Sequence, residues 1–132
     1  MTPAPTTGPR PREVAVLAGL VLLEALGLAV ATLRLLWALL FEEPLTVGGT
    51  VFLTLVAAAG ALWLLRVGRG LWRGFRWPRA AALVVQLFLL VVSFPLLQAG
   101  EWAGLVPAVP ALVVLVLLFR PAVLAWTTRT LR

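Results

Sequence analysis

The chain has 132 residues, of which 62% are hydrophobic and 12% are charged. Soluble domains average about 45–50% apolar and about 25% charged residues, so this chain has too little polar surface to cover a water-soluble fold. The composition predicts a single membrane domain. The net charge of +6 comes from 11 Arg and 5 Glu. Because the Arg residues flank apolar segments, we interpret them as determinants of membrane orientation and expect no nucleic-acid partner.

The chain also lacks most residues that carry chemistry. It contains no Cys, His or Asp. Their absence excludes disulfides, thiolate nucleophiles, imidazole bases and the common zinc sites. Ser93 is the only serine, and no base lies near it in the sequence. We therefore expect no enzyme, no cofactor and no metal site.

In chain order, residues 1–12 carry four Pro among Thr, Gly and Arg, which is typical of a disordered cytoplasmic tail. A four-helix transmembrane domain is expected over residues 13–120. The first apolar segment is long enough to cross about 30 Å of hydrocarbon with tilt. A basic cytoplasmic loop separates the second segment from the third, and a short cytoplasmic tail ends the chain. The expected helices cover residues 14–41, 45–65, 80–99 and 102–119, with the loop at 66–79 and the tail at 121–132.

Short connections make consecutive helices antiparallel neighbours. The expected fold is therefore an all-α membrane protein, with four antiparallel transmembrane helices in a compact bundle. Pro95 lies inside the third segment and should kink it, because proline removes a backbone hydrogen bond. The alternative is a soluble helical bundle. The almost uniform Leu, Val and Ala coating of the third and fourth segments argues against that alternative.

The charges predict the orientation of this bundle. Ten of the 11 Arg flank the segments on one side, and the short connections on the other side carry Glu42, Glu43 and Glu101. Cytoplasmic loops of membrane proteins are enriched in Arg and Lys. Both termini and the basic loop are therefore predicted to be cytoplasmic, in a multi-pass protein of the bacterial cytoplasmic membrane.

Six polar residues lie within the apolar segments and are candidates for an intramembrane site. Glu24 lies about 15 Å from the inner end of the first segment, and Gln86 about 9 Å from the same side. An ionised carboxylate there is costly. Glu24 is either a proton-coupled site or a neutral acid that donates a hydrogen bond to Gln86 or a carbonyl for packing. Arg34 is expected to snorkel to outer water or to an outer Glu, and the hydroxyls to bond their own backbone. The six candidates are Glu24, Arg34, Thr50, Thr54, Gln86 and Ser93.

The basic loop is a candidate for lipid binding. Arg66, Arg69, Arg73 and Arg76 recur at spacings of 3, 4 and 3, which would place them on one helical face. Two interpretations of this pattern stand side by side. The basic residues either form a short interfacial helix that touches anionic headgroups, or they only set the orientation of the chain in the membrane. Interfacial tryptophans would anchor such a loop at headgroup depth. The headgroup candidates are Arg66, Arg69, Trp72, Arg73, Arg76, Trp77 and Arg79.

Four stretches of the chain carry a resemblance to known proteins. They are LVLLEALGLAV (20–30), RGLWRGFRWPR (69–79), ALVVQLFLL (82–90) and LLQAGEW (96–102). With these stretches the chain resembles a group of small four-span membrane proteins common in high-GC actinobacteria, which implies a fold and a location but no activity. The stretch around Glu24 is also similar to the first helix of small multidrug resistance transporters. That resemblance implies proton exchange at Glu24, although this chain has no Tyr for the aromatic site of those transporters.

Two functions follow from these observations. The first is a non-enzymatic multi-pass membrane protein that acts as an accessory or interaction subunit and contacts anionic lipid. The alternative is a small proton-coupled transporter that uses Glu24 and works as an oligomer. The expected partners are membrane lipids, together with further copies of the chain or a larger membrane protein.

Overall fold

The fold was obtained as a computed structural model, which describes residues 9–128. The first eight residues of the expected Pro-rich tail and the last four residues of the expected C-terminal tail lie outside this range. Within it the chain is helical, with no strand. The elements are α1 (Arg12–Phe41), α2 (Val47–Arg73), α3 (Trp77–Gln98), the 3-10 turn η1 (Trp102–Gly104), α4 (Leu105–Leu118) and α5 (Pro121–Thr128).

Three to four of these helices have the length and apolarity of membrane spans. Each of α1, α2 and α3 is long and apolar enough to cross a membrane by itself. The segment Trp102–Leu118 meets the same condition only together with Pro121–Thr127, from which it is bent by 70°. The expectation of an all-helical membrane protein therefore agrees with the structure in its coarse form. Helix α3 remains helical through Pro95 as far as Gln98.

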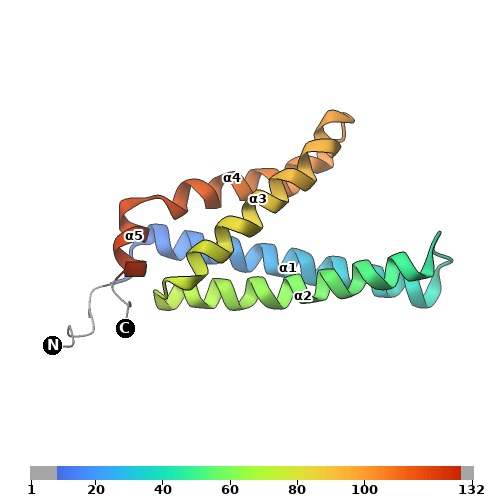
Figure 1. Cartoon of the computed structure of the whole chain (residues 1–132), viewed down its shortest axis with the longest axis horizontal. Helices are drawn as coiled ribbons and strands as arrows, with labels where there is room; N and C mark the ends of the chain where they lie inside the picture. The colour runs from blue at the N-terminus through green and yellow to red at the C-terminus, as the bar shows by residue number, and fades with distance from the viewer. Residues whose placement is uncertain (1–8, 129–132) are drawn as a thin grey trace.

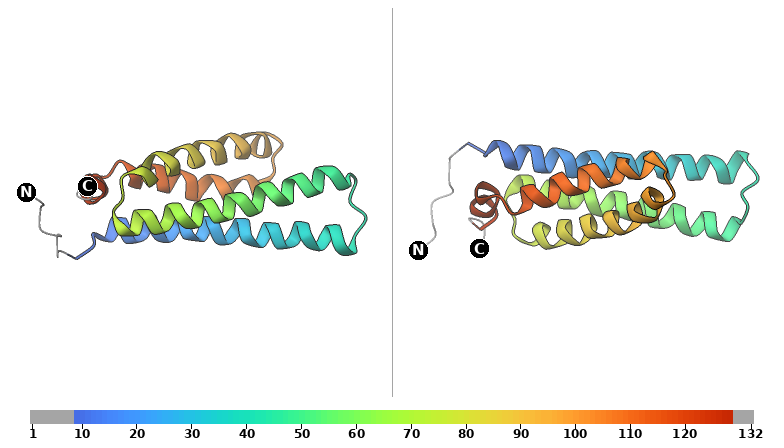
Figure 2. Two further views of the ribbon diagram at one scale, coloured as in Figure 1. Left: turned by 60° about the horizontal axis from the view of Figure 1, so that its bottom comes forward. Right: turned by 90° about the horizontal axis from the view of Figure 1, so that it is seen from above.

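The helices form two hairpins. Figure 1 shows α1 and α2 side by side along their length, with α3 and α4 as a second pair that crosses over them. Residues 42–46 connect α1 to α2, and residues 99–101 connect α3 to η1. In the further views of Figure 2 both connections lie at one end, which we call the distal end. The start of α1, the residues 74–76 and α5 lie at the other end, which we call the arginine-rich end.

Helix α2 extends well beyond the segment expected from its apolar residues. It continues to Arg73, so only residues 74–76 separate it from α3. The basic segment 66–79 is thus mostly helix, and its first half belongs to α2. The reason is amphipathicity, since Leu64, Val67 and Leu71 are buried at helical spacing.

A left-handed glycine ends α2. Gly74 has φ of 85°, which side chains other than glycine rarely adopt, and the Phe75 amide donates to the Gly70 carbonyl at 2.9 Å. This pattern of bonds is a Schellman-type termination, which satisfies carbonyls at the end of the helix. The turn brings the start of α3 back against the end of α2.

The chain after α4 also differs from the expected tail. Residues 121–128 form α5, which turns across the arginine-rich end (Figure 1). Val123 and Thr127 are buried, and the Trp126 indole donates to the Leu71 carbonyl at 3.2 Å. This helix is held in place by the burial of Val123 and by the hydrogen bond from the Trp126 indole to the backbone at the end of α2.

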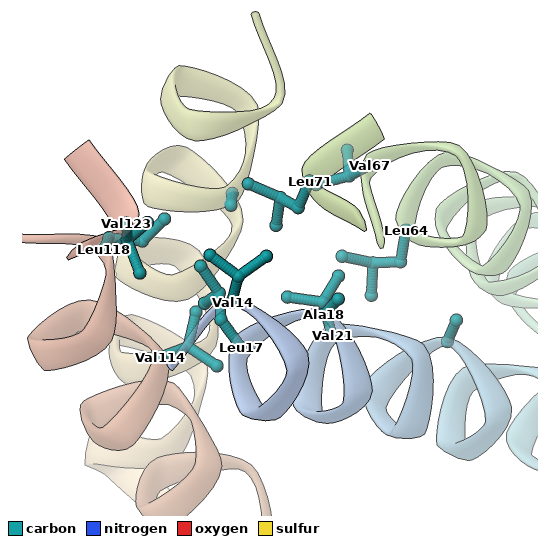
Figure 3. Packing of buried hydrophobic residues seen from close by; sticks show 12 residues of the cluster. Val14, Leu17, Ala18, Val21, Leu64, Val67, Leu71, Val114, Leu118 and Val123 are labelled. Carbon is teal, nitrogen blue, oxygen red and sulfur yellow. The ribbon is translucent and has the colours of Figure 1, made fainter. Parts of the chain in front are cut away.

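The buried apolar core lies at the arginine-rich end. It combines the first half of α1 with the last turns of α2, the beginning of α3, the end of α4 and α5, as Figure 3 shows in close view. The residues of this core are Val14, Leu17, Ala18, Val21, Ala25, Leu64, Val67, Leu71, Ala82, Val114, Leu118 and Val123. Towards the distal end the two hairpins diverge (Figure 1), and most side chains there are exposed. Tight packing between the hairpins is therefore confined to one end of the molecule.

Candidate functional site

A polar pair joins the two hairpins just beyond the apolar core. The Gln86 Nε2 atom on α3 donates a hydrogen bond of 2.7 Å to the Glu24 Oε2 atom on α1. Gln86 is fully buried, with 0% of its surface exposed. The contact between Glu24 and Gln86 that their depths suggest is thus present, and the carboxyl group acts as the acceptor.

Two oxygen atoms of this pair have no partner within residues 9–128. They are Glu24 Oε1 and Gln86 Oε1, both of which are buried. A carboxylate has only acceptors, whereas a protonated carboxyl group also has one donor. A single proton on Glu24 would therefore add an O–H donor to the N–H donors that the Gln86 amide already provides. The arrangement can hold a proton or accept a hydrogen bond.

Glu24 lies at one side of an apolar cavity of about 500 Å³. The cavity lies between the two hairpins, and its walls come from all four long helices. Glu24 is the only charged residue among those that line it. Within residues 9–128, Glu24 is thus the one titratable group that faces this cavity and could bind a proton. Other lining residues are Leu26, Leu64, Leu89, Val106 and Pro110.

Arg34 does not join this pair. Its guanidinium forms a salt bridge with Glu42 at the end of the same helix, with Nη1 and Oε1 at 3.2 Å and Nη2 and Oε2 at 3.3 Å. Both side chains are exposed. The salt bridge holds Arg34 at the distal end, which is where the snorkelling interpretation expects its guanidinium to lie.

The hydroxyl groups serve their own helices. The hydroxyls of Thr50, Thr54 and Ser93 donate to carbonyls one turn earlier, those of Thr46, Thr50 and Leu89, at 2.7–2.8 Å. Ser93 is buried, whereas Thr50 and Thr54 are half-buried. Because these donors are already satisfied, the three residues are poor candidates for ligand binding in this conformation.

Two glycines of α2 determine how closely α1 approaches α2. They are not among the polar candidates of the sequence. A Cβ atom at Gly68 would lie 2.8 Å from Leu22 Cδ2, and one at Gly60 would lie 3.2 Å from Leu28 Cδ1. Small residues allow membrane helices to approach closely. Gly60 and Gly68 are eight positions apart, and this helical spacing is the sequence signal that identifies them.

The arginine-rich end gathers the headgroup candidates. The side chains of Arg66, Arg69, Arg73 and Arg76 are exposed, and Arg79 is half-buried. The first three lie on the last turns of α2, and the other two flank the start of α3. The turn at residues 74–76 therefore brings the two groups of arginines to the same end of the molecule.

The tryptophans at this end have different partners. Arg10 lies over the Trp72 ring at 4.2 Å from its centroid, and its Nε donates to the Trp72 carbonyl at 3.0 Å. The Trp77 ring contacts the Trp63 ring at a centroid distance of 5.9 Å. Both Trp72 and Trp77 remain partly exposed, at 41% and 48%. Arg10 was not among the residues singled out in the sequence, because nothing in the local pattern links it to Trp72.

A second cavity, of about 550 Å³, lies at the arginine-rich end between the start of α3 and the end of α4. Its lining contains two arginines, two aromatic residues and three aliphatic ones. They are Arg76, Trp77, Arg79, Ala80, Leu83, Leu118 and Phe119. We call it the arginine pocket.

These features define a helical protein with three to four membrane-compatible spans, a Glu–Gln pair between two of its helices and a basic end. Comparison with protein-family models, with curated proteins and with solved structures finds no match to the chain.

Proposed function

We propose that this chain is a non-enzymatic, multi-pass protein of the bacterial cytoplasmic membrane. Four antiparallel helices would cross the bilayer as a bundle, with a kink of the third at Pro95. Both termini and residues 74–76 would face the cytoplasm. The support for this orientation is the separation of charges, because Glu42, Glu43 and Glu101 belong to the distal connections and the arginines to the other end.

The proposed role is that of an accessory or interaction subunit that contacts anionic lipid. The observation that carries the lipid contact is the row of exposed guanidinium groups at one end, on Arg66, Arg69, Arg73 and Arg76. Each basic residue near an anionic surface contributes about 1 kcal/mol of attraction. The lack of His, Cys and Asp supports a role other than catalysis.

Single-cysteine labelling tests the orientation, since the chain has no native Cys. Gly70 is buried, and a Cβ atom there would collide with Pro78, so the exposed Phe75 is the better position. In intact cells an impermeant thiol reagent should label Glu43→Cys and Glu101→Cys but not Phe75→Cys. Labelling of Phe75→Cys before lysis would overturn the orientation.

Lipid retention tests the proposed contact. The purified protein should retain phosphatidylglycerol over phosphatidylcholine at low salt, as measured by mass spectrometry of co-purified lipid. Arg66→Gln/Arg69→Gln/Arg73→Gln should weaken this preference by about fivefold for each charge removed. Equal retention of the two lipids by the parent protein at low salt would contradict the proposed function.

A second candidate function is favoured by one observation, the Glu24–Gln86 pair beside its apolar cavity. In this proposal an oligomer of the chain would couple proton binding at Glu24 to transport, in keeping with the resemblance to small multidrug resistance transporters. Liposomes that hold the protein should then show substrate movement in response to a pH step. Glu24→Gln should abolish it while the protein remains folded. Unchanged movement in that variant would reject this candidate.

A further inference from the structure

The arginine pocket differs from the rest of the arginine-rich end because residues of two helices line it. Arg76 and Arg79 contribute its charge, and no carboxylate lines it. Neither guanidinium forms an ion pair within the described part of the chain. The pocket therefore presents two positive charges that residues 9–128 do not neutralise.

Arg79 gives the more specific signal. Its Nε atom is buried and has no hydrogen-bond partner within residues 9–128. A buried donor that lacks a partner is costly, and the cost is greater for a charged group. An anionic oxygen in the pocket would satisfy this donor. A guanidinium binds a phosphate group especially well, since it offers several N–H donors in one plane.

The start of α3 adds to the positive potential. Residues 76, 77, 79 and 80 of the lining belong to the first turn of α3 or directly precede it. No side chain caps this end of the helix. The helix dipole favours an anion there.

The remaining walls suit a hydrocarbon chain. Leu83 follows Arg79 by one helical turn, or about 6 Å along α3. Leu118 and Phe119 face it from the end of α4. Trp77 and Phe119 are partly exposed, as expected for aromatic residues at the level of lipid headgroups. The pocket thus combines an anion site with an apolar wall that extends towards the bilayer.

We infer that the arginine pocket binds one anionic glycerophospholipid of the leaflet at this end, with its phosphate between Arg76 and Arg79 and an acyl chain against Leu83 and Phe119. This inference rests on the proposed function, which places this end at an anionic membrane surface. It goes further by assigning a single lipid to a defined pocket, whereas the exposed arginines of α2 attract anionic lipids collectively. The apolar wall favours a lipid over free phosphate, which has no hydrocarbon to bury.

The experiment measures lipid retained by the purified full-length protein after a wash at about 1 M salt, where the Debye length falls to about 3 Å. Diffuse attraction is then screened, and a lipid held in the pocket should remain. The probes are phosphatidylglycerol, phosphatidylcholine and inorganic phosphate. The parent should keep one phosphatidylglycerol per chain, and millimolar inorganic phosphate should not displace it.

Two double variants with the same charge change separate the pocket from the exposed arginines. Arg76→Gln/Arg79→Gln should weaken retention of phosphatidylglycerol by at least about 30-fold, because the charge-assisted hydrogen bonds of two guanidinium groups to the phosphate are lost. The matched control Arg66→Gln/Arg69→Gln should keep the bound lipid at high salt. If both variants lose the lipid equally, or neither loses it, the pocket is overturned while the preference of the parent at low salt still supports the proposed function. A parent without that preference at low salt would overturn both.

Arg79→Lys provides a test that does not depend on net charge. Lysine keeps the positive charge but has no Nε donor in the same place, so retention should fall by about tenfold. Unchanged retention in Arg79→Lys, or displacement of the lipid by inorganic phosphate, would overturn the inference. Circular dichroism and the melting temperature of each variant establish that any loss occurs in a folded protein.

Discussion

Removal of the carboxyl group of Glu24 gives the sharpest test of the polar contact between the hairpins. Gln86 is fully buried and donates a hydrogen bond of 2.7 Å to Glu24. In Glu24→Leu its buried amide would lose this acceptor. Interhelical hydrogen bonds in membrane proteins contribute about 0.6 kcal/mol on average and about 1.7 kcal/mol at most. The bond is short and Gln86 is completely buried. We therefore place the contribution of this hydrogen bond near the upper value, at about 1.5 kcal/mol.

Glu24→Gln is the matched control, because glutamine keeps an acceptor oxygen at the same distance along the side chain. It should lower the free energy of unfolding by only about 0.5 kcal/mol. The assay is equilibrium unfolding in mixed micelles, followed by circular dichroism, for Glu24→Leu, Gln86→Leu and the double variant. The double-mutant cycle should give a coupling energy of about 1 kcal/mol. A coupling within about 0.3–0.5 kcal/mol of zero, as for independent sites, would refute the reasoning.

Four further substitutions test how the helices pack. Gly68→Ala should lower the free energy of unfolding by about 1–3 kcal/mol, because its Cβ would meet Leu22. Gly19→Ala is the control, since its Cβ would meet nothing within 4 Å. It should leave the free energy of unfolding unchanged or raise it by up to about 1 kcal/mol in the same assay. Gly74→Ala should lower the melting temperature, since a left-handed conformation costs about 1–2 kcal/mol for a residue with a side chain. Leu17→Ala should cost about 2 kcal/mol, because Leu17 is fully buried and its loss leaves a cavity. A melting temperature equal to that of the parent in Gly68→Ala, Gly74→Ala or Leu17→Ala, or a lower one in Gly19→Ala, would contradict the packing described for that position.

The contact between Glu24 and Gln86 shows how far the sequence leads at the candidate site. Their depths along two apolar segments could be counted at 1.5 Å per residue, and this count brings the two side chains within reach of each other. The count does not say which faces of the helices meet. The cavity beside Glu24 depends on the angle between the hairpins, which follows from the packing of the whole core at the other end.

The composition and the order of apolar segments determine by themselves that the chain is helical and suited to a membrane. A bilayer admits only backbone that is bonded internally, so long apolar stretches must become helices. The distribution of Arg and Glu follows directly from the sequence as well. These properties are local or summed over the chain, and they need no knowledge of which residues touch.

Tertiary structure alone decided the contacts between distant segments. Helix α2 extends into the basic segment because α1 covers its apolar residues Leu64, Val67 and Leu71. Helix α5 docks because the Trp126 indole donates a hydrogen bond to the Leu71 carbonyl. The arginine pocket likewise needs the end of α4 beside the start of α3. In an apolar chain nearly every helix face is suitable for burial, so hydropathy does not distinguish the face that packs from the face that meets lipid. Shape does so, through small residues such as Gly68 and a turn such as the one at Gly74, and it is fixed only when the helices pack together.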